Sequence, residues 1–151
     1  VKVDVPAEVA KASAAINREI TITEPIGPDP LLLGVLDAQL PADAPVVLAT
    51  AGTSDLEAQA AFDALAAEWT QRRGTHVLVA YASQAQPDVA SAISRLESEG
   101  EHKAAIARFL LFDGVFPDRI KADAGDRAIT SVLGDASVLA EIIADRVLAT
   151  R

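Results

Sequence analysis

Runs of apolar and β-branched residues alternate along the chain with segments in which apolar residues recur at helical spacing. The runs predict strands at residues 20–24, 45–50, 76–81 and 103–112 and, more weakly, at 127–133. The helical spacing predicts helices at residues 28–40, 55–73, 87–99 and 135–148. Apolar strands that alternate with helices favour parallel pairing, with helices on both faces. We therefore predict an α/β fold, a doubly wound parallel sheet of about four strands.

An internal similarity links two parts of the chain. Residues 20–40 and 128–148 share the order of strand, hydrophobic-Gly turn and helix. One offset of 107 positions relates their anchor pairs, which are Gly27 and Gly134, Ile22 and Ile129, Val35 and Ile142, and Leu36 and Ile143. Two helices of an α/β protein can be alike by chance, and the alternative is a duplicated protein. We favour duplication, with residues 1–40 as the strand-and-helix tail of a first repeat and residues 41–151 as a complete second repeat.

Composition excludes several classes of function. The 151 residues carry a formal charge of −9 and have an isoelectric point near 4.6, which argues against nucleic acid and anionic membrane surfaces as partners. The absence of Cys excludes disulfides, thiolate catalysis and Cys-based zinc sites, and is compatible with the cytoplasmic location that we expect. No apolar run approaches the roughly 20 residues that a membrane span needs.

Three loops follow the carboxyl ends of predicted strands, at residues 50–55, 82–87 and 113–119. This edge is where ligands bind in open parallel sheets. In the first loop, Gly52 would allow the backbone to approach a ligand closely, and the next helix would offer free N–H groups to an anion. The competing interpretation, which we favour for the loop alone, is a capping box in which Ser54 and Glu57 satisfy those N–H groups.

Few other residues of the sequence suggest a catalytic or binding function. The second loop is small and polar, and the third holds an Asp118–Arg119 pair of the kind that solvent usually screens. His76 and His102 each precede a predicted strand, so we expect both at the opposite, amino edge of the sheet and in structural roles. The sequence contains no Ser-His-Asp arrangement, His-x-x-x-His pair, Walker loop or Gly-x-Gly-x-x-Gly motif.

Two loop motifs resemble a known family. AGTSD at residues 51–55 resembles a His-Gly-Ser/Thr-Arg-Asp type motif, and GVFPDRI at residues 114–120 resembles Gly-x-His-x-x-x-Asp-Ile. Residues 46–120 therefore resemble one half of a class II tetrapyrrole chelatase, closest to the sirohydrochlorin cobalto- and ferrochelatases of cobalamin and siroheme biosynthesis. IGPDPLLLGVL at residues 26–36 resembles the Gly-Pro-x-Pro-Leu segment that closes a chelatase half, and VKVDVPAEV at residues 1–9 resembles the sequence after the second family His of the preceding half.

The chain departs from this family at both catalytic positions. Ala51 stands where the family has its first His, and Phe116 and Pro117 stand around the second. Family chemistry needs those imidazoles, because neutral His can ligate the divalent metal and accept pyrrole protons. The resemblance thus implies that this degenerate half has no catalytic residue and no metal ligand. The catalytic pair would lie in an absent first half, whose final His would fall just before Val1.

The resemblance also implies a role for this half. The complete protein would insert Co²⁺ or Fe²⁺, as a substrate and not as a firmly bound cofactor, into an acidic tetrapyrrole. The half represented by this chain would serve as a scaffold and as one wall of the substrate cleft. The residues implied in binding the macrocycle are Gly52, Thr53, Ser54, Ser83, Gln84 and Arg119. The charge of −9 counts mildly against an anionic substrate.

Two other functions stay open. The first is a non-catalytic dimerisation or interaction module, in which the apolar helices at 28–40 and 135–148 pack across a homodimer interface or against the missing N-terminal half. The second is a flavodoxin-like phosphate or flavin binder that uses the TAGTS turn. We rank this second function last because the predicted cleft loops supply few aromatic residues, chiefly Phe112 and Phe116.

Overall fold

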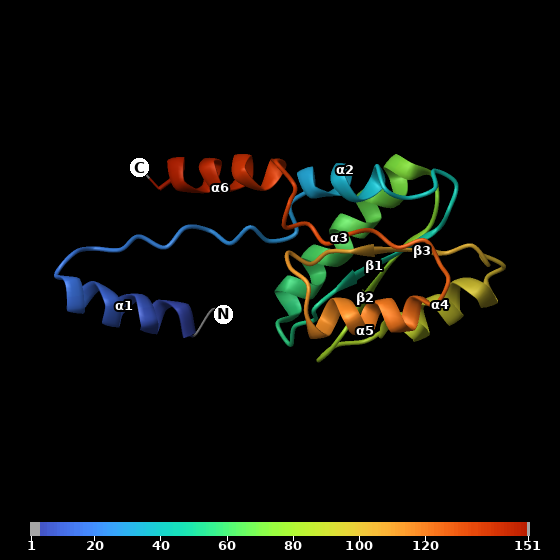
Figure 1. Ribbon diagram of the computed structural model, residues 1–151, viewed down its shortest axis with the longest axis horizontal. Helices are drawn as coiled ribbons and strands as arrows, with labels where there is room; N and C mark the ends of the chain where they lie inside the picture. Colours follow the sequence, from blue (N-terminus) through green and yellow to red (C-terminus); the bar gives the residue numbers. More distant parts are fainter. Residues whose placement is uncertain (1–3, 151) are drawn as a thin grey trace. The chain divides into compact units, whose positions relative to one another are not determined.

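The computed structural model describes residues 4–150 (Figure 1), so the first three positions of the motif at residues 1–9 lie outside the described residues. Contacts divide the chain into two units. The larger unit is Pro28–Leu139, and the smaller unit combines Val1–Gly27 with Ala140–Arg151.

The larger unit is built on a parallel sheet. Its strands are β1 (Val46–Thr50), β2 (Val77–Tyr81) and β3 (Ala105–Arg108), in the order β2-β1-β3. In the register, Val46 of the central strand lies opposite both Val77 and Ala105. All five residues of β1 are buried, which explains its unbroken apolar sequence.

Helices cover both faces of this sheet. They are α2 (Leu31–Asp37), α3 (Leu56–Arg73), α4 (Val89–Ser98) and α5 (Val115–Ala124). Figure 1 shows α2 and α3 on one face and α4 and α5 on the other. On the second face Val47, Ile106, Ile93 and Ile120 form the centre of a buried apolar cluster. The predicted α/β fold, a parallel sheet flanked by helices, is therefore confirmed.

The number of strands is lower than predicted, with three in place of about four. Residues 127–133 contribute only an isolated parallel bridge between Ile129 and Ile106. The Arg108 N–H donates to the side-chain oxygen of Thr130 and not to a backbone carbonyl, so the ladder ends there. Residues 20–24 lie in the smaller unit and form no strand, because an extended segment becomes a strand only when it is paired with another.

The predicted helices are all present, although each starts later than predicted and α2 and α4 also end earlier. The helix at 135–148 is α6 (Val138–Leu148). Two helices were missed, α1 (Asp4–Ile16) and α5. A Pro stands in the first turn of each, where its missing N–H costs nothing but where it disguises the helical pattern. The stretch at 113–119 that was predicted as a loop is therefore largely the start of α5.

One side chain fixes α2 against α3. Arg73 is almost fully buried, pairs with Asp37 at the end of α2, and donates to the Ala44 carbonyl oxygen at 3.2 Å. Trp69 also donates to Asp37, at 3.1 Å. These bonds hold the connection between α2 and β1 against α3.

The smaller unit contains α1, an extended segment over residues 18–27, and most of α6. Along α1 every side chain whose burial is described is exposed or half-buried. Across residues 4–150, no helix is both long enough and apolar enough to cross a membrane.

Candidate functional site at the carboxyl edge of the sheet

The loops that follow β1 and β2 are packed tightly together at the carboxyl edge. The Ser83 hydroxyl donates to the Ala51 carbonyl oxygen at 2.8 Å, and the Ala82 N–H donates to the Thr50 carbonyl oxygen at 2.9 Å. Gly52 has a φ of +102°, and a Cβ placed on it would lie 1.8 Å from the Ser83 carbonyl oxygen. Glycine is required here by the neighbouring loop and by its own backbone angle.

The N-terminus of α3 is capped by Asp55. Its carboxylate accepts a hydrogen bond from the Glu57 N–H at 3.0 Å, while the Thr53 hydroxyl oxygen accepts from the Asp55 N–H at 3.1 Å. The predicted capping box with Ser54 as the cap is therefore wrong. The helix begins one residue later than that box requires, at Leu56, and Ser54 is exposed. The N-terminus is nevertheless capped, as the favoured interpretation of the loop expected, so fewer of its N–H groups are free to bind an anion.

A polar pocket of about 490 Å³ lies beside these loops, at the end of β2. Its polar lining residues come from the end of β2, from the β2–α4 loop and from α5, and they are Tyr81, Ser83, Gln84, Gln86, Asp88, Arg119 and Asp123. Three residues of the predicted binding set, Ser83, Gln84 and Arg119, thus share one pocket. The other three, Gly52, Thr53 and Ser54, belong to the adjoining loop and do not line it.

Arg119 and Asp88 fix the walls of this pocket. Arg119 donates from Nη1 to the Ala82 carbonyl oxygen at 3.0 Å, which ties α5 to the end of β2. Asp88 caps α4 by accepting from the Ser91 N–H at 2.8 Å. The pKa of Asp88 lies below its ordinary value because of its hydrogen bonds from Ser91 and the nearby positive charge of Arg119. The pKa of Tyr81 is raised by burial and by the charge of Asp63.

Sequence reasoning missed two acidic members of the pocket. Asp88 was hidden because the helix was predicted to begin at Pro87, yet an Asp directly after Pro and before an apolar run is a typical N-cap. Asp123 was hidden because α5 was not predicted. Once α5 is known, Asp123 stands four residues after Arg119, on the same side of the helix.

No imidazole stands at the two positions, Ala51 and Phe116, that the loop motifs predict for the family histidines. Ala51 is half-buried where β1 ends, and Phe116 is 40% exposed in the first turn of α5. The histidines of the chain lie at the amino edge, as predicted. His76 precedes β2 and approaches Glu99 at 3.3 Å, and His102 precedes β3 and is exposed. Among the described residues, no group of three or more His, Cys, Asp and Glu side chains could hold a metal ion.

The fold is that of a doubly wound α/β protein, with a polar pocket beyond the carboxyl edge of its parallel sheet. The sequence model of the CbiX family matches residues 45–150. The chain belongs to the CbiX family. The resemblance to class II tetrapyrrole chelatases predicted from the loop motifs is thereby confirmed.

Solved structures share the fold. SirB from Bacillus subtilis with Fe³⁺ superposes with a TM-score of 0.77 at 21% identity, over 99% of this chain and 65% of that chain. The sirohydrochlorin chelatase SirB from Bacillus subtilis subspecies spizizenii, in complex with cobalt, superposes with a TM-score of 0.72 at 22% identity, over 99% of this chain and 62% of that chain. A CbiX protein of Marinobacter aquaeolei VT8, assigned to cobalamin (vitamin B12) biosynthesis, superposes with a TM-score of 0.55 at 22% identity, over 71% of this chain and 96% of that chain.

The two SirB chains are longer than this one, which spans less than two thirds of their length. At these identities the likeness shows the fold alone. A search among curated protein sequences finds no match.

Proposed function

We propose that the chain is the C-terminal part of a sirohydrochlorin chelatase-like protein, which inserts Co²⁺ or Fe²⁺ into a tetrapyrrole in cobalamin or siroheme biosynthesis. In this proposal the present half is a non-catalytic scaffold that forms one wall of the cleft. The proposal is supported by the CbiX match over residues 45–150, together with Ala51 and Phe116 at the positions that the loop motifs predict for the family histidines.

The chemistry of metal insertion explains why those two positions matter. As the ion enters the macrocycle, the pyrrole nitrogens must lose protons to a base, and neutral imidazole can both accept a proton and ligate a divalent metal. A methyl group and a phenyl ring can do neither. The backbone of Ala51 is also engaged, because its carbonyl oxygen accepts the Ser83 hydroxyl. This half can therefore position a substrate without taking part in proton transfer.

The polar pocket supplies groups suited to that positioning role. A guanidinium binds carboxylates through parallel N–H groups, and Arg119 uses only part of its donor set on the Ala82 carbonyl oxygen. Ser83 and Gln84 add a hydroxyl and an amide at the same wall. We assign these three residues to binding the acidic side chains of the macrocycle, and Gly52, Thr53 and Ser54 to the adjoining wall.

The charges around Arg119 limit how much this wall binds alone. Asp88 and Asp123 line the same pocket, and the whole chain carries a charge of −9. A polycarboxylate therefore gains little here without further cations. We propose that the preceding half completes both the cleft and its catalytic pair, and that the metal passes through as a substrate. The SirB structures hold Fe³⁺ or cobalt, which supports a metal substrate for the family.

The test is metal insertion into sirohydrochlorin, followed by absorbance, with the 151-residue chain and with a longer polypeptide that restores the half before Val1. We expect insertion only with the longer polypeptide. Activity of the shorter chain by itself would contradict the non-catalytic role. An inert longer polypeptide would favour the interaction module instead, which exposed apolar side chains such as Ile143 and Val147 on α6 also suggest.

A further inference from the structure

The loop between β2 and α4 contains a strained turn at Gln84. The φ of Gln84 is +61°, in the left-handed region that residues other than Gly, Asn, Asp and His seldom adopt. The Ala85 N–H donates to the Ser83 carbonyl oxygen at 2.8 Å, only two residues back along the chain. A hydrogen bond of this span, with a positive φ at the middle residue, defines a γ-turn of the rarer and strained hand.

Elsewhere the chain meets a positive φ with residues that tolerate it. Six of its eight glycines have a positive φ, and among the described residues the one other non-glycine residue with a positive φ is Asn17. Asn is tolerated in this region because its short polar side chain can form a local hydrogen bond, whereas the longer side chain of Gln lacks this advantage. A glycine at position 84 would relieve the strain, so the glutamine side chain contributes something that glycine could not.

The contribution of this side chain is not made through hydrogen bonding within the protein. Gln84 is exposed, and within residues 4–150 its side chain takes part in no hydrogen bond. The neighbouring Gln86 differs, because its side-chain oxygen accepts from the Asp88 N–H at 3.2 Å. The strain at Gln84 is therefore not offset by a hydrogen bond that its own side chain makes inside the fold.

The strained turn persists because both ends of the loop are fixed. At the start of the loop, the Ser83 hydroxyl donates to the Ala51 carbonyl oxygen at 2.8 Å. At its end, the Pro87 carbonyl oxygen accepts from the Tyr81 N–H at 2.9 Å. Strained residues survive where the surrounding structure determines the backbone in this way, and such residues cluster at ligand sites. The turn thus holds the Gln84 side chain at a fixed place in the pocket wall.

The chemistry of the polar pocket indicates what an amide can bind there. Gln84 lines it together with Arg119, Asp88 and Asp123, so the pocket has one more negative than positive side chain. An amide is neutral and offers two N–H donors, so it can bind a carboxylate without a change in the charge of the pocket. Arg119 uses only part of its donor set on the Ala82 carbonyl oxygen, which leaves further donors for the same carboxylate.

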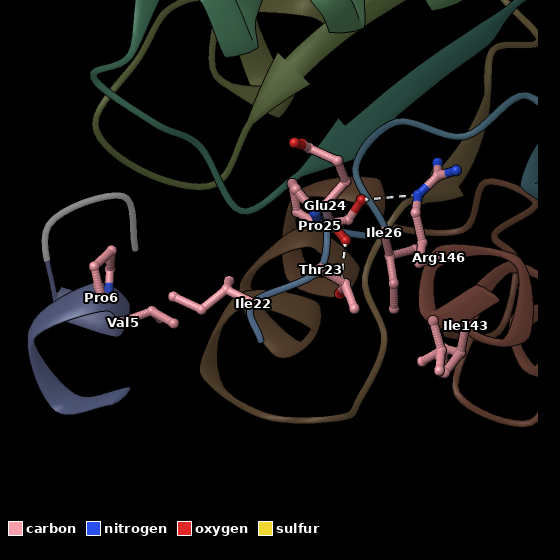
Figure 2. A pocket seen from close by; sticks show the side chains of 10 residues that line it. Val5, Pro6, Ile22, Thr23, Glu24, Pro25, Ile26, Ile143 and Arg146 are labelled. Carbon is pink, nitrogen blue, oxygen red and sulfur yellow. Dashed lines mark hydrogen bonds between the residues drawn. The ribbon is translucent and has the colours of Figure 1, made fainter. Parts of the chain in front are cut away.

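The pocket of the smaller unit is different in kind. It has a volume of about 620 Å³ and is lined mainly by apolar side chains, and Figure 2 shows those of Val5 and Ile22 pointing toward each other. Its Arg146 donates to the Pro25 carbonyl oxygen at 3.4 Å, and none of its lining residues has a positive φ. The polar pocket, and not this one, therefore combines a strained backbone with a polar side chain that has no hydrogen-bond partner in the protein.

We propose that Gln84 is a specificity-determining residue, whose strained turn holds its side-chain amide against a carboxylate of the ligand. The amide donates to one carboxylate oxygen, and the remaining donors of Arg119 donate to the other. An acidic tetrapyrrole presents carboxylates of this kind, so the inference rests on the proposed function for the identity of the ligand. It adds that this wall recognises its ligand at a measurable loss of stability, which glycine at position 84 would restore.

The first part of the test separates the amide from the backbone strain. Gln84→Ala removes the amide and keeps the strain, whereas Gln84→Gly removes both. Gln84→Gly should raise the melting temperature of the 151-residue chain by about 2 °C or more, and Gln84→Ala should leave it nearly unchanged. Ala85→Gly is the matched control. Since Ala85 has no positive φ, glycine relieves nothing there and should lower the melting temperature.

The second part measures binding in the absence of metal. Sirohydrochlorin is titrated into the isotope-labelled 151-residue chain, and the side-chain amide resonance of Gln84 is followed by nuclear magnetic resonance, which detects weak binding. We expect this resonance to shift to a saturating value. Gln84→Ala and Gln84→Gly should both raise the dissociation constant by about fivefold or more, because each removes a hydrogen bond to a charged group.

Three results would overturn the inference. They are a melting temperature that fails to rise in Gln84→Gly, a dissociation constant that both variants leave unchanged, and a Gln84 resonance that does not respond to sirohydrochlorin. Binding that depends on Gln84, in a protein whose longer polypeptide inserts no metal, would leave this inference standing and remove only the proposed function. Metal insertion by the longer polypeptide, with binding that is indifferent to residue 84, would do the reverse.

Discussion

The Ser83 hydroxyl donates a hydrogen bond to the Ala51 carbonyl oxygen at 2.8 Å, where the loops after β1 and β2 meet. This bond joins Ala51, the position that the loop motif predicts for a family histidine, to the wall of the polar pocket. It also brings the Ser83 carbonyl oxygen over Gly52. The edge of the sheet is therefore held in shape by contacts within the protein, as the proposed scaffold role requires.

The close contact at Gly52 predicts a large cost for any side chain there. Gly52→Ala would place a Cβ 1.8 Å from the Ser83 carbonyl oxygen and would force alanine to a φ of +102°. We expect a loss of about 2 to 4 kcal/mol in the free energy of unfolding. Gly74→Ala is the control, since Gly74 also has a positive φ but has nothing within 4 Å of its Cβ position. It should cost only about 1 kcal/mol. Equal losses in urea unfolding would contradict the contact.

The position of the cap on α3 gives a second prediction. Asp55→Ala removes the acceptor for the Glu57 N–H and should cost about 1 kcal/mol in the free energy of unfolding. Ser54→Ala is the neighbouring control, and because Ser54 does not cap the helix it should change stability by less than about 0.5 kcal/mol. Chemical denaturation of both variants measures the two losses. A larger loss for Ser54→Ala than for Asp55→Ala would contradict the Asp55 cap and support the Ser54 capping box.

The lowered pKa of Asp88, in the wall of the polar pocket, should make the stability of the protein depend on pH. Folding lowers the pKa of Asp88, through hydrogen bonds from Ser91 and the charge of Arg119. A carboxyl with a lowered pKa stabilises the fold above its unfolded pKa of about 3.9, and this contribution is lost as the pH falls through the folded-state pKa. The unfolding free energy of Asp88→Asn should therefore fall less steeply than that of the native chain below about pH 4. Parallel curves in denaturation between about pH 2 and 5 would show that Asp88 contributes nothing.

Arg119 should act in binding and not in proton transfer. In a longer polypeptide that inserts metal, Arg119→Gln should raise KM for sirohydrochlorin by about tenfold and change kcat by less than about twofold. Arg95→Gln is the control, because Arg95 is exposed on α4 and pairs with Glu99 outside the pocket. Steady-state kinetics separate the two parameters. A fall in kcat with an unchanged KM would instead place Arg119 in the chemical step.

The sequence predicted the parts of the fold that depend on local pattern. The three strands found are apolar throughout or nearly so, and α3 and α4 have clear starts and stops, so all five could be recognised. Residues 20–24 have an equally strand-like sequence but form no strand, since pairing depends on a partner distant in the chain or outside it. The helix α5 was missed because Phe116 and Pro117 resemble a loop.

The candidate site was predictable only in part, for a related reason. Ser83, Gln84 and Arg119 were predicted to lie near one another because their predicted loops follow strand ends, which converge at one edge in any parallel sheet, and all three line the polar pocket. Asp123 depends on α5, and the role of Gly52 depends on how closely another loop approaches it. Such contacts depend on packing between segments that are far apart in the chain, so local sequence patterns do not predict them.

The rate of Co²⁺ insertion into sirohydrochlorin by the 151-residue chain alone, followed by absorbance, tests most directly the claim that this half has no catalytic pair. The account predicts the same rate as in the absence of protein. A rate that rises in proportion to the concentration of the chain would contradict it, because catalysis would then proceed without an imidazole at position 51 or 116.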